Sequence, residues 1–226
     1  MTTTRVISVG GSLIAPPARG VDTDFLKGFR RLILEHLEAE AERRVILVCG
    51  GGAPAREYQR AYREVLGESA ADAEDWIGIA ATCLNAELLR QLFAPLCPEK
   101  VVTDPTALSV FPGRVLVAAG WKPGFSTDHD AVLLAERFQA DQLINLSNVP
   151  RVYSADPRQD PTARPLDRLR WSELQELVGR RWQPGINVPF DPVATAHAAG
   201  LRLTLIVADG RNIPNLRSLL AGGDFE

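Results

Sequence analysis

The sequence predicts an α/β fold with a mostly parallel central sheet sandwiched by helices. Two observations lead to this prediction: strand-like apolar runs alternate with helical patterns along the chain, and three of the strands end in a glycine-containing turn before a helix. Strands that alternate with helices usually form a parallel sheet covered on both faces. The length of 226 residues, 46% of them hydrophobic, is sufficient for a packed core.

The strands are predicted from short apolar runs rich in β-branched residues. In chain order, they are expected at 6–9, 45–49, 101–103, 114–119, 142–146 and 203–207. Residues 147–170 are rich in Pro, Asp and Arg, and we expect a long loop there.

The helices are predicted from apolar residues at helical spacing and from capping residues. They are expected over 24–40, from Pro54 onward, and over 75–93, 128–138, 191–199 and 215–220. Asp24 can cap the first of these helices, and His36 is expected on the exposed side of that helix. Pro54 suits a first helical turn. The predicted buried face of the 75–93 helix consists of Trp76, Ile79, Ala80, Cys83, Leu84 and Leu88.

Composition and charge disfavour several classes of function. A net charge of −3 argues against nucleic acid as a non-specific partner. The chain has no apolar run long enough for a membrane span, and its amino terminus lacks the layout of a signal peptide. The cysteines (Cys49, Cys83 and Cys97) include no CxxC motif, which fits a reducing cytoplasm. The histidines have no metal-ligand spacing, so we expect no built-in metal site.

The glycine-containing turns are Gly10–Ser12, Gly50–Gly52 and Gly120–Thr127. The carboxyl ends of parallel strands share one edge of the sheet, where ligands bind. Glycine lets the backbone approach an oxyanion, and helix N-termini direct N–H groups toward it. Three such turns on one edge favour phosphate binding over simple tight connections. The GxGxxG and GxxxxGK[ST] motifs are absent from the sequence, which disfavours a Rossmann dinucleotide site and a P-loop.

Four charged residues lie close to these turns, and each has a structural alternative. Arg56 could reach back to a phosphate or be a solvated helix residue. Asp75 could bind ribose hydroxyls or cap the following helix, and the residues alone favour the cap. Asp128 could hold a cation at the phosphate edge or cap its helix. Lys122 could contact a phosphate or be a solvated loop lysine.

The order of these turns resembles the amino acid kinase superfamily over nearly the whole chain. The most specific stretch is Pro123-Gly-Phe-Ser-Thr-Asp128, followed by Leu133-Leu-Ala-Glu136. Residues 147–157 and Asp160-Pro-Thr-Ala163 look like the family's nucleotide loop, and Phe190-Asp-Pro-Val-Ala194 resembles the segment that closes the nucleotide lobe. Within the superfamily, the chain is most similar to the UMP kinase branch in its archaeal-type form.

The resemblance implies the carbamate kinase-like fold of this superfamily and a role for each matching position. A single domain over 1–226 would combine an acceptor lobe (about 1–125) with a nucleotide lobe (about 126–226). ATP would contact Gly11, Ser12, Gly52, Arg56, Ser147, Asn148, Tyr153 and Asp156. UMP would contact Gly51, Asp75, Trp121, Lys122, Pro123, Gly124, Phe125, Ser126 and Thr127. Asp128 matches an acid that organises the catalytic centre, and Lys122 and Arg56 are expected to supply positive charge there.

The chain departs from the common family pattern at several positions. Ser8 stands where many members carry a lysine, although the archaeal-type branch also lacks that lysine. Ala53 occupies the position of another common lysine, and Cys83 that of an expected arginine. Pro150-Arg151 replaces the usual Asp-Gly.

The resemblance implies a cytoplasmic kinase of pyrimidine nucleotide biosynthesis that converts ATP and UMP to ADP and UDP. Mg²⁺ would arrive with ATP, and a homohexamer, or a dimer as its unit, is expected from the family. One alternative is another superfamily kinase that phosphorylates a different small phosphate or acid. A second alternative is a non-catalytic nucleotide- or oxyanion-binding protein on the same fold, which would bind ATP without releasing ADP.

Overall fold

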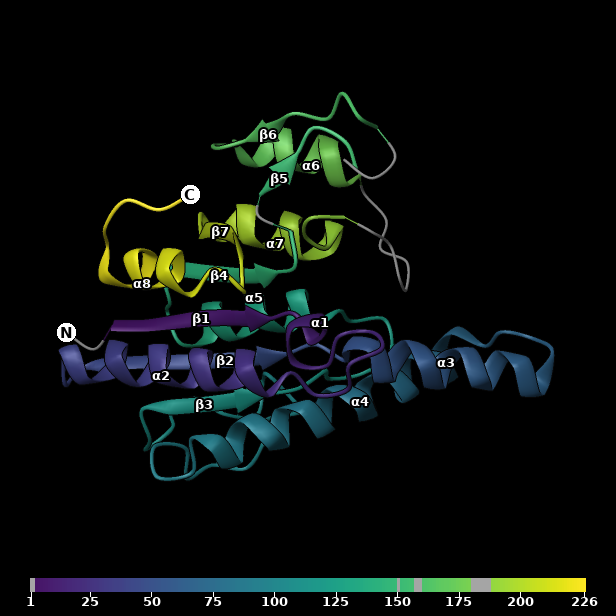
Figure 1. Cartoon of the computed structure of the whole chain (residues 1–226), viewed down its shortest axis with the longest axis horizontal. Coiled ribbons are helices and arrows are strands. Elements are labelled where there is room, and N and C mark those ends of the chain that lie inside the picture. The colour runs from purple at the N-terminus through teal and green to yellow at the C-terminus, as the bar shows by residue number, and fades with distance from the viewer. Residues whose placement is uncertain (1–2, 150, 157–159, 180–187) are drawn as a thin grey trace.

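A five-stranded parallel sheet forms the centre of the computed structural model, which describes residues 3–149, 151–156, 160–179 and 188–226. The strand order is β3-β2-β1-β4-β7, and helices cover both faces (Figure 1). The α/β prediction is therefore confirmed. The strands are β1 (Thr3–Val9), β2 (Arg43–Cys49), β3 (Val115–Ala118), β4 (Gln142–Ser147) and β7 (Thr204–Asp209).

Alternate residues of each strand belong to two separate hydrophobic cores, because successive side chains of a strand point to opposite faces. Ile7 and Val9 pack in the core formed with α2 (Thr23–Ala39), α4 (Ala71–Leu92) and α8 (Ile213–Ala221). Val6 packs in the core formed with α5 (Thr127–Arg137) and α7 (Pro192–Leu201). The strands therefore read as continuous apolar runs.

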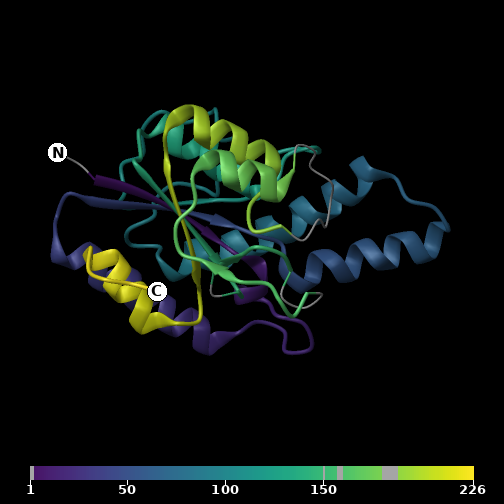
Figure 2. The ribbon, with the colours of Figure 1, turned by 90° about the horizontal axis from the view of Figure 1, so that it is seen from above.

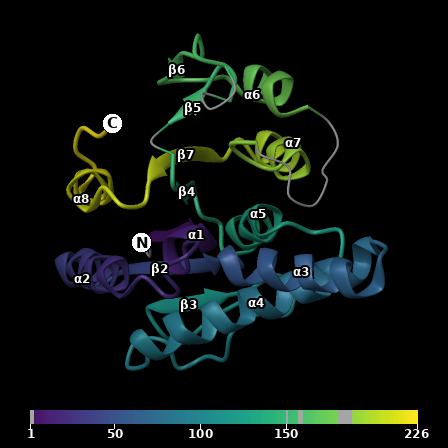
Figure 3. The ribbon, with the colours of Figure 1, turned by 45° about the vertical axis from the view of Figure 1, so that its right-hand side comes forward.

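Two parts of the chain extend beyond the sheet. The short helix α1 (Gly11–Ile14) follows β1 directly, while α3 (Gly52–Leu66) and α4 run side by side past the carboxyl ends of the strands (Figures 1 and 2). Beyond the β7 edge of the sheet, β5 (Val152–Tyr153) and β6 (Pro165–Leu166) pair antiparallel beside α6 (Trp171–Val178), which packs against α7 (Figure 3).

Several details differ from the sequence-based expectation. The expected loop over 147–170 contains β5 and β6, and α6 follows it. The expected strand at 101–103 is reduced to one bridge between Val102 and Ala118. Asp22, not Asp24, caps α2, because its side chain accepts a hydrogen bond from the N–H of Phe25 at 3.0 Å. In the described part of the chain, no helix combines the length and apolar character that crossing a membrane requires.

The predicted buried face of α4 is wrong in half of its residues: Cys83 and Leu88 pack against the core and Ile79 is half-buried, but the other three residues are exposed. Trp76 is 56% exposed and Leu84 69% exposed, and Ala80 on the same stripe is exposed too. Apolar and small residues surround most of this helix, so their spacing does not define one face. The fully buried residues of α4 are Glu74, Thr82, Asn85, Ala86 and Leu89.

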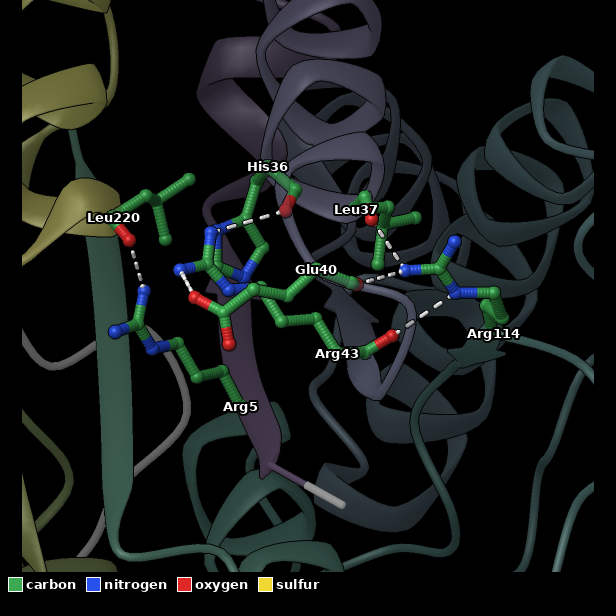
Figure 4. A network of polar contacts seen from close by, with 7 residues as sticks. All are labelled: Arg5, His36, Leu37, Glu40, Arg43, Arg114 and Leu220. Atoms are coloured by element: carbon green, nitrogen blue, oxygen red, sulfur yellow. Dashed lines mark hydrogen bonds and ion pairs between the residues drawn. The ribbon is translucent and has the colours of Figure 1, made fainter. Parts of the chain in front are cut away.

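The C-terminal end of α2 is capped by arginine side chains at the amino-terminal edge of the sheet (Figure 4). Arg114 donates to the carbonyl oxygens of Leu37, of Glu40 at 2.7 Å and of Arg43 at 3.2 Å. The last carbonyl groups of a helix have no partner within it. Arg114 therefore supplies donors to carbonyl groups at the end of α2, of which that of Leu37 belongs to a buried residue.

His36 lies inside this network, so its expected exposed position is wrong. It is 6% exposed, and Arg43 donates to its carbonyl oxygen at 3.2 Å (Figure 4). Arg5, whose Nη1 donates to the Leu220 carbonyl at 2.6 Å, lies on the other side. Burial, together with the charges of Arg5 and Arg43, lowers the pKa of His36 to about 4. The imidazole is therefore neutral in the folded protein at neutral pH.

Candidate active site

The first two glycine turns touch each other at the carboxyl edge of the sheet. The N–H of Gly50 donates to the Val9 carbonyl at 3.0 Å. A Cβ atom on Gly11 would lie 2.1 Å from the backbone nitrogen of Gly52, and Gly52 has a φ of +70°. Only glycine fits this approach, because a side chain would collide with backbone atoms. The close pairing fixes the start of α1 next to the start of α3.

A cleft of about 820 Å³ opens at this edge of the sheet. Its volume lies within the range of small-molecule sites. It brings together many residues that the sequence predicted for ATP, for UMP and for catalysis. Those that line it are Ser12, Gly51, Gly52, Arg56, Asp75, Phe125, Ser126, Thr127, Asp128, Ser147, Asn148, Tyr153 and Asp156.

The remaining predicted residues lie next to the cleft without lining it. They are Gly11, Trp121, Lys122, Pro123 and Gly124. The ammonium of Lys122 lies over two aromatic rings, 3.7 Å from the centroid of Trp121 and 4.8 Å from that of Phe125. The predicted contact of Lys122 with a phosphate would therefore need this side chain to leave the rings.

The loop of residues 120–126 is anchored by side chains from outside it. They accept hydrogen bonds from three backbone N–H groups: Thr82 Oγ1 from Gly120 at 2.8 Å, Asp130 Oδ2 from Trp121 at 3.1 Å, and Asp75 Oδ2 from Gly124 at 2.8 Å. Because α4 begins at Ala71 after an N-cap at Ala70, Asp75 lies inside the helix and does not cap it. The capping explanation of Asp75 is therefore wrong.

Asp128 lies in the first turn of α5, which Ser126 caps through the N–H of His129. Asp128 Oδ2 accepts from the backbone N–H of Asp191 at 3.2 Å, and its Oδ1 accepts from the Ser8 hydroxyl at 3.4 Å. Burial is the main reason that the pKa of Asp128 rises to about 7, and the nearby charge of Asp191 adds to this effect. A carboxyl in this state changes its charge near neutral pH at the wall of the cleft.

Two arginines bring positive charge to the cleft. Arg56 Nη2 donates to the hydroxyl of Ser12 at 3.5 Å, so the side chain reaches back over the glycine turns. Arg151 also lines the cleft and forms ion pairs with Asp167 at 2.7 Å and with Glu226 at 3.7 Å. Sequence reasoning did not assign a role to Arg151, although its replacement of the usual glycine was a signal.

Other lining residues were missed because the sequence alone does not show which helix face meets the cleft. Thr82, Ile79 and Gln59 come from α3 and α4, and Asp191 caps α7 through the N–H of Ala194 at 2.7 Å. A threonine among the apolar residues of α4 was the one available signal for Thr82, because buried hydroxyl groups need hydrogen-bond partners.

The cleft combines backbone N–H groups at glycine turns, hydroxyl groups, arginines and a carboxyl of raised pKa. This set is suited to binding phosphate oxygens and to positioning a phosphoryl group for transfer. The fold and the cleft therefore define a phosphate-binding α/β protein of the phosphotransferase type.

Comparison with known proteins identifies the family. The family model described as the amino acid kinase family matches residues 3–209, so the chain belongs to that family. A uridylate kinase of Methanospirillum hungatei is 35% identical over 225 residues, which cover 98% of this chain and 92% of that protein. A uridylate kinase of Archaeoglobus fulgidus is 40% identical over 193 residues, with 84% and 83% covered. The crystal structure of an Archaeoglobus fulgidus uridylate kinase matches with a TM-score of 0.81 at 35% identity, covering 97% of this chain and 96% of that one. The resemblance inferred from the sequence is confirmed.

Proposed function

We propose that this chain transfers the γ-phosphoryl group of ATP to UMP, giving ADP and UDP for pyrimidine nucleotide biosynthesis. Its relatives named uridylate kinase support this proposal, because the first of them aligns with 98% of the chain at 35% identity. The observation that carries the proposal is the cleft, in which the glycine turns, Asp75, the end of the 120–126 loop and residues of 147–149 and 151–156 meet.

The acceptor half of the cleft is proposed to bind UMP. Asp75 Oδ2 holds Gly124, and its other carboxylate oxygen is proposed to accept hydrogen bonds from the ribose hydroxyls. Gly51 and the 120–126 loop with Thr127 would enclose the nucleotide, and Ser126 and Thr127 would supply hydroxyl groups. Phe125 stacks on His129, with the ring centroids 5.0 Å apart, which gives this wall a rigid aromatic surface.

The donor half is proposed to bind ATP. Ser12, Gly52 and Arg56 would contact its phosphates, with Gly11 supporting the turn from behind. The adenosine would lie along Ser147, Asn148, Tyr153 and Asp156, which line the cleft on the side of β5. The proposed acceptor lobe (about 1–125) and nucleotide lobe (about 126–226) thus share one cleft.

The proposed chemistry is the positioning of the substrates and the neutralisation of charge on the phosphoryl group during its transfer. Arg56 and Lys122 would neutralise its oxygens, and Asp128 would orient the groups around it through its bonds to Ser8 and Asp191. Mg²⁺ would enter with ATP, whose phosphates bind it readily.

The active protein is proposed to be a cytoplasmic homo-oligomer, a hexamer or a dimer as its unit. The exposed stripe of Trp76, Ala80 and Leu84 on α4 supports self-association, because large apolar residues exposed together mark interaction surfaces. The three cysteines are free thiols, as a reducing compartment favours.

A coupled ADP-release assay tests the proposal. UMP would be compared with CMP, dUMP, AMP, GMP, isopentenyl phosphate, glutamate and aspartate, and we expect UMP to give the highest kcat/KM. dUMP should react less well, because it lacks a hydroxyl for Asp75. The Asp128→Asn variant, purified in the same way, controls for contaminating kinases. A faster reaction with any other acceptor, or ATP binding without ADP release, would overturn the proposal.

A further inference from the structure

Asp130 is a buried carboxyl to which the proposed chemistry gives no role. It lies in the first turn of α5, is 0% exposed and does not line the cleft. Its Oδ2 accepts from the N–H of Trp121 at 3.1 Å, while its Oδ1 has no hydrogen-bond partner among the described residues. A buried polar group in this state is unusual in a native protein, and its retention calls for an explanation.

The surroundings of Asp130 favour the neutral acid. Burial is the main reason that its pKa rises to about 7, and the carboxylates of Asp128, Asp104 and Asp191 raise it further. The N–H of Trp121 acts in the opposite direction. An uncharged carboxyl costs far less to bury than a carboxylate, so the acid can remain in the core while it accepts this hydrogen bond.

The hydrogen bond from Trp121 differs from the other anchors of the 120–126 loop. Thr82 and Asp75 also hold backbone N–H groups of this loop, but both of them line the cleft. Asp130 makes its hydrogen bond to the loop and does not touch the cleft, so this hydrogen bond can influence a bound molecule only through the loop. The loop transmits that influence because its last residues, Phe125 and Ser126, line the cleft.

We propose that Asp130 is a positioning residue, whose carboxyl fixes the Trp121 amide and thereby holds the 120–126 loop in the conformation that binds the acceptor. This inference rests on the proposed function, in which the acceptor is UMP. Loss of the hydrogen bond leaves the Trp121 N–H without its acceptor, and the loop shifts to find another. Binding of UMP then weakens, while binding of ATP on the far side of the cleft does not.

Three variants test the inference in steady-state kinetics. Asp130→Ala removes the acceptor, and Asp130→Leu removes it while keeping the core filled. In both, we expect the KM for UMP to rise about tenfold, the ratio that corresponds to one lost hydrogen bond, with the KM for ATP within about twofold. Asp130→Asn keeps an oxygen acceptor without a charge, so it should restore a KM for UMP close to that of the wild type.

Hydrogen exchange of the 118–126 segment gives a readout that needs no turnover. The Ala and Leu variants should exchange faster there than the wild type, and the Asn variant should not. Val132→Ala, at a fully buried position of the same helix, is the control for general destabilisation. An unchanged KM for UMP and unchanged exchange in both the Ala and Leu variants would overturn the inference, and so would an Asn variant as impaired as Ala or equal effects of Val132→Ala. If the wild type lacks turnover with UMP, the proposed function fails and the exchange experiment still decides the role of Asp130.

Discussion

The ionisation of Asp128 provides a quantitative test of its proposed role. Its pKa rises from 3.8 to about 7, mainly through burial. About half of the free enzyme therefore carries the carboxylate at pH 7, about one-tenth at pH 6 and about one-hundredth at pH 5. If the orientation of groups around the phosphoryl requires the carboxylate, kcat/KM should rise about tenfold per pH unit below 7 and level off above it, because this parameter reports ionisations of the free enzyme.

The Asp128→Asn variant removes this ionisation. We expect kcat to fall by about 10²-fold, the scale for losing one preorganised group in the transition state, with modest changes in KM. The pH profile of the variant should lose its inflection near pH 7. Asp141→Asn is the matched control, because Asp141 is an exposed carboxyl just before β4, at the opposite edge of the sheet. A pH profile that Asp128→Asn leaves unchanged, or a kcat within about threefold of the wild type, would refute the reasoning.

The remaining predictions concern binding, stability and charge. Asp75→Asn should raise the KM for UMP more than that for ATP, and equal increases in both would contradict a role of Asp75 in the acceptor half of the cleft. Tyr153→Ala should weaken ATP binding through lost contact with the nucleoside, and an unchanged calorimetric Kd would remove this assignment. His36, with its pKa lowered from 6.5 to about 4, is neutral when folded, so stability should be full above pH 6.5 and fall as the pH drops toward 4. His36→Gln should flatten this fall in thermal unfolding between pH 7 and 4.5, and a parallel fall in both proteins would contradict the assignment. Lys122→Met should lower kcat by about 10²–10³-fold with little change in the KM for UMP.

The sheet could be predicted from the sequence because four of its five parallel strands are largely buried on both faces. A strand such as Arg43–Cys49 is then almost uniformly apolar along its buried part, and the glycines after it mark where it ends. The α4 face could not be predicted, because apolar and small residues surround that helix and only its packing on α3 and the sheet decides which are buried. Trp76 and Leu84 are exposed for this reason.

The members of the site could be predicted where they lie in the turns after strands, since topology brings those turns to one edge. Contacts between elements could not be predicted, because they depend on tertiary packing. Thr82 lies 38 residues before Gly120, whose N–H group donates a hydrogen bond to it. Ser8 lies 120 residues before Asp128, to which its hydroxyl donates. Asp130 had no sequence signal beyond its place in a helical first turn.

The source of positive charge at the phosphoryl group can be argued from the partners of each cation. Ser8 gives Asp128 a neutral hydroxyl donor, whereas a lysine ammonium at this place would favour the carboxylate. Of the cations that line the cleft within the described residues, Arg151 is paired with two carboxylates, whereas Arg56 contacts only the neutral hydroxyl of Ser12. Lys122 would have to exchange its contacts with two rings for a phosphate, and such contacts are worth only about 0.5–2 kcal/mol. A phosphoryl group that gains charge in a desolvated cleft can outweigh that cost. The large loss of kcat expected for Lys122→Met follows from this comparison, and a loss of less than about threefold would leave Arg56, backbone N–H groups and Mg²⁺ as the sources of charge.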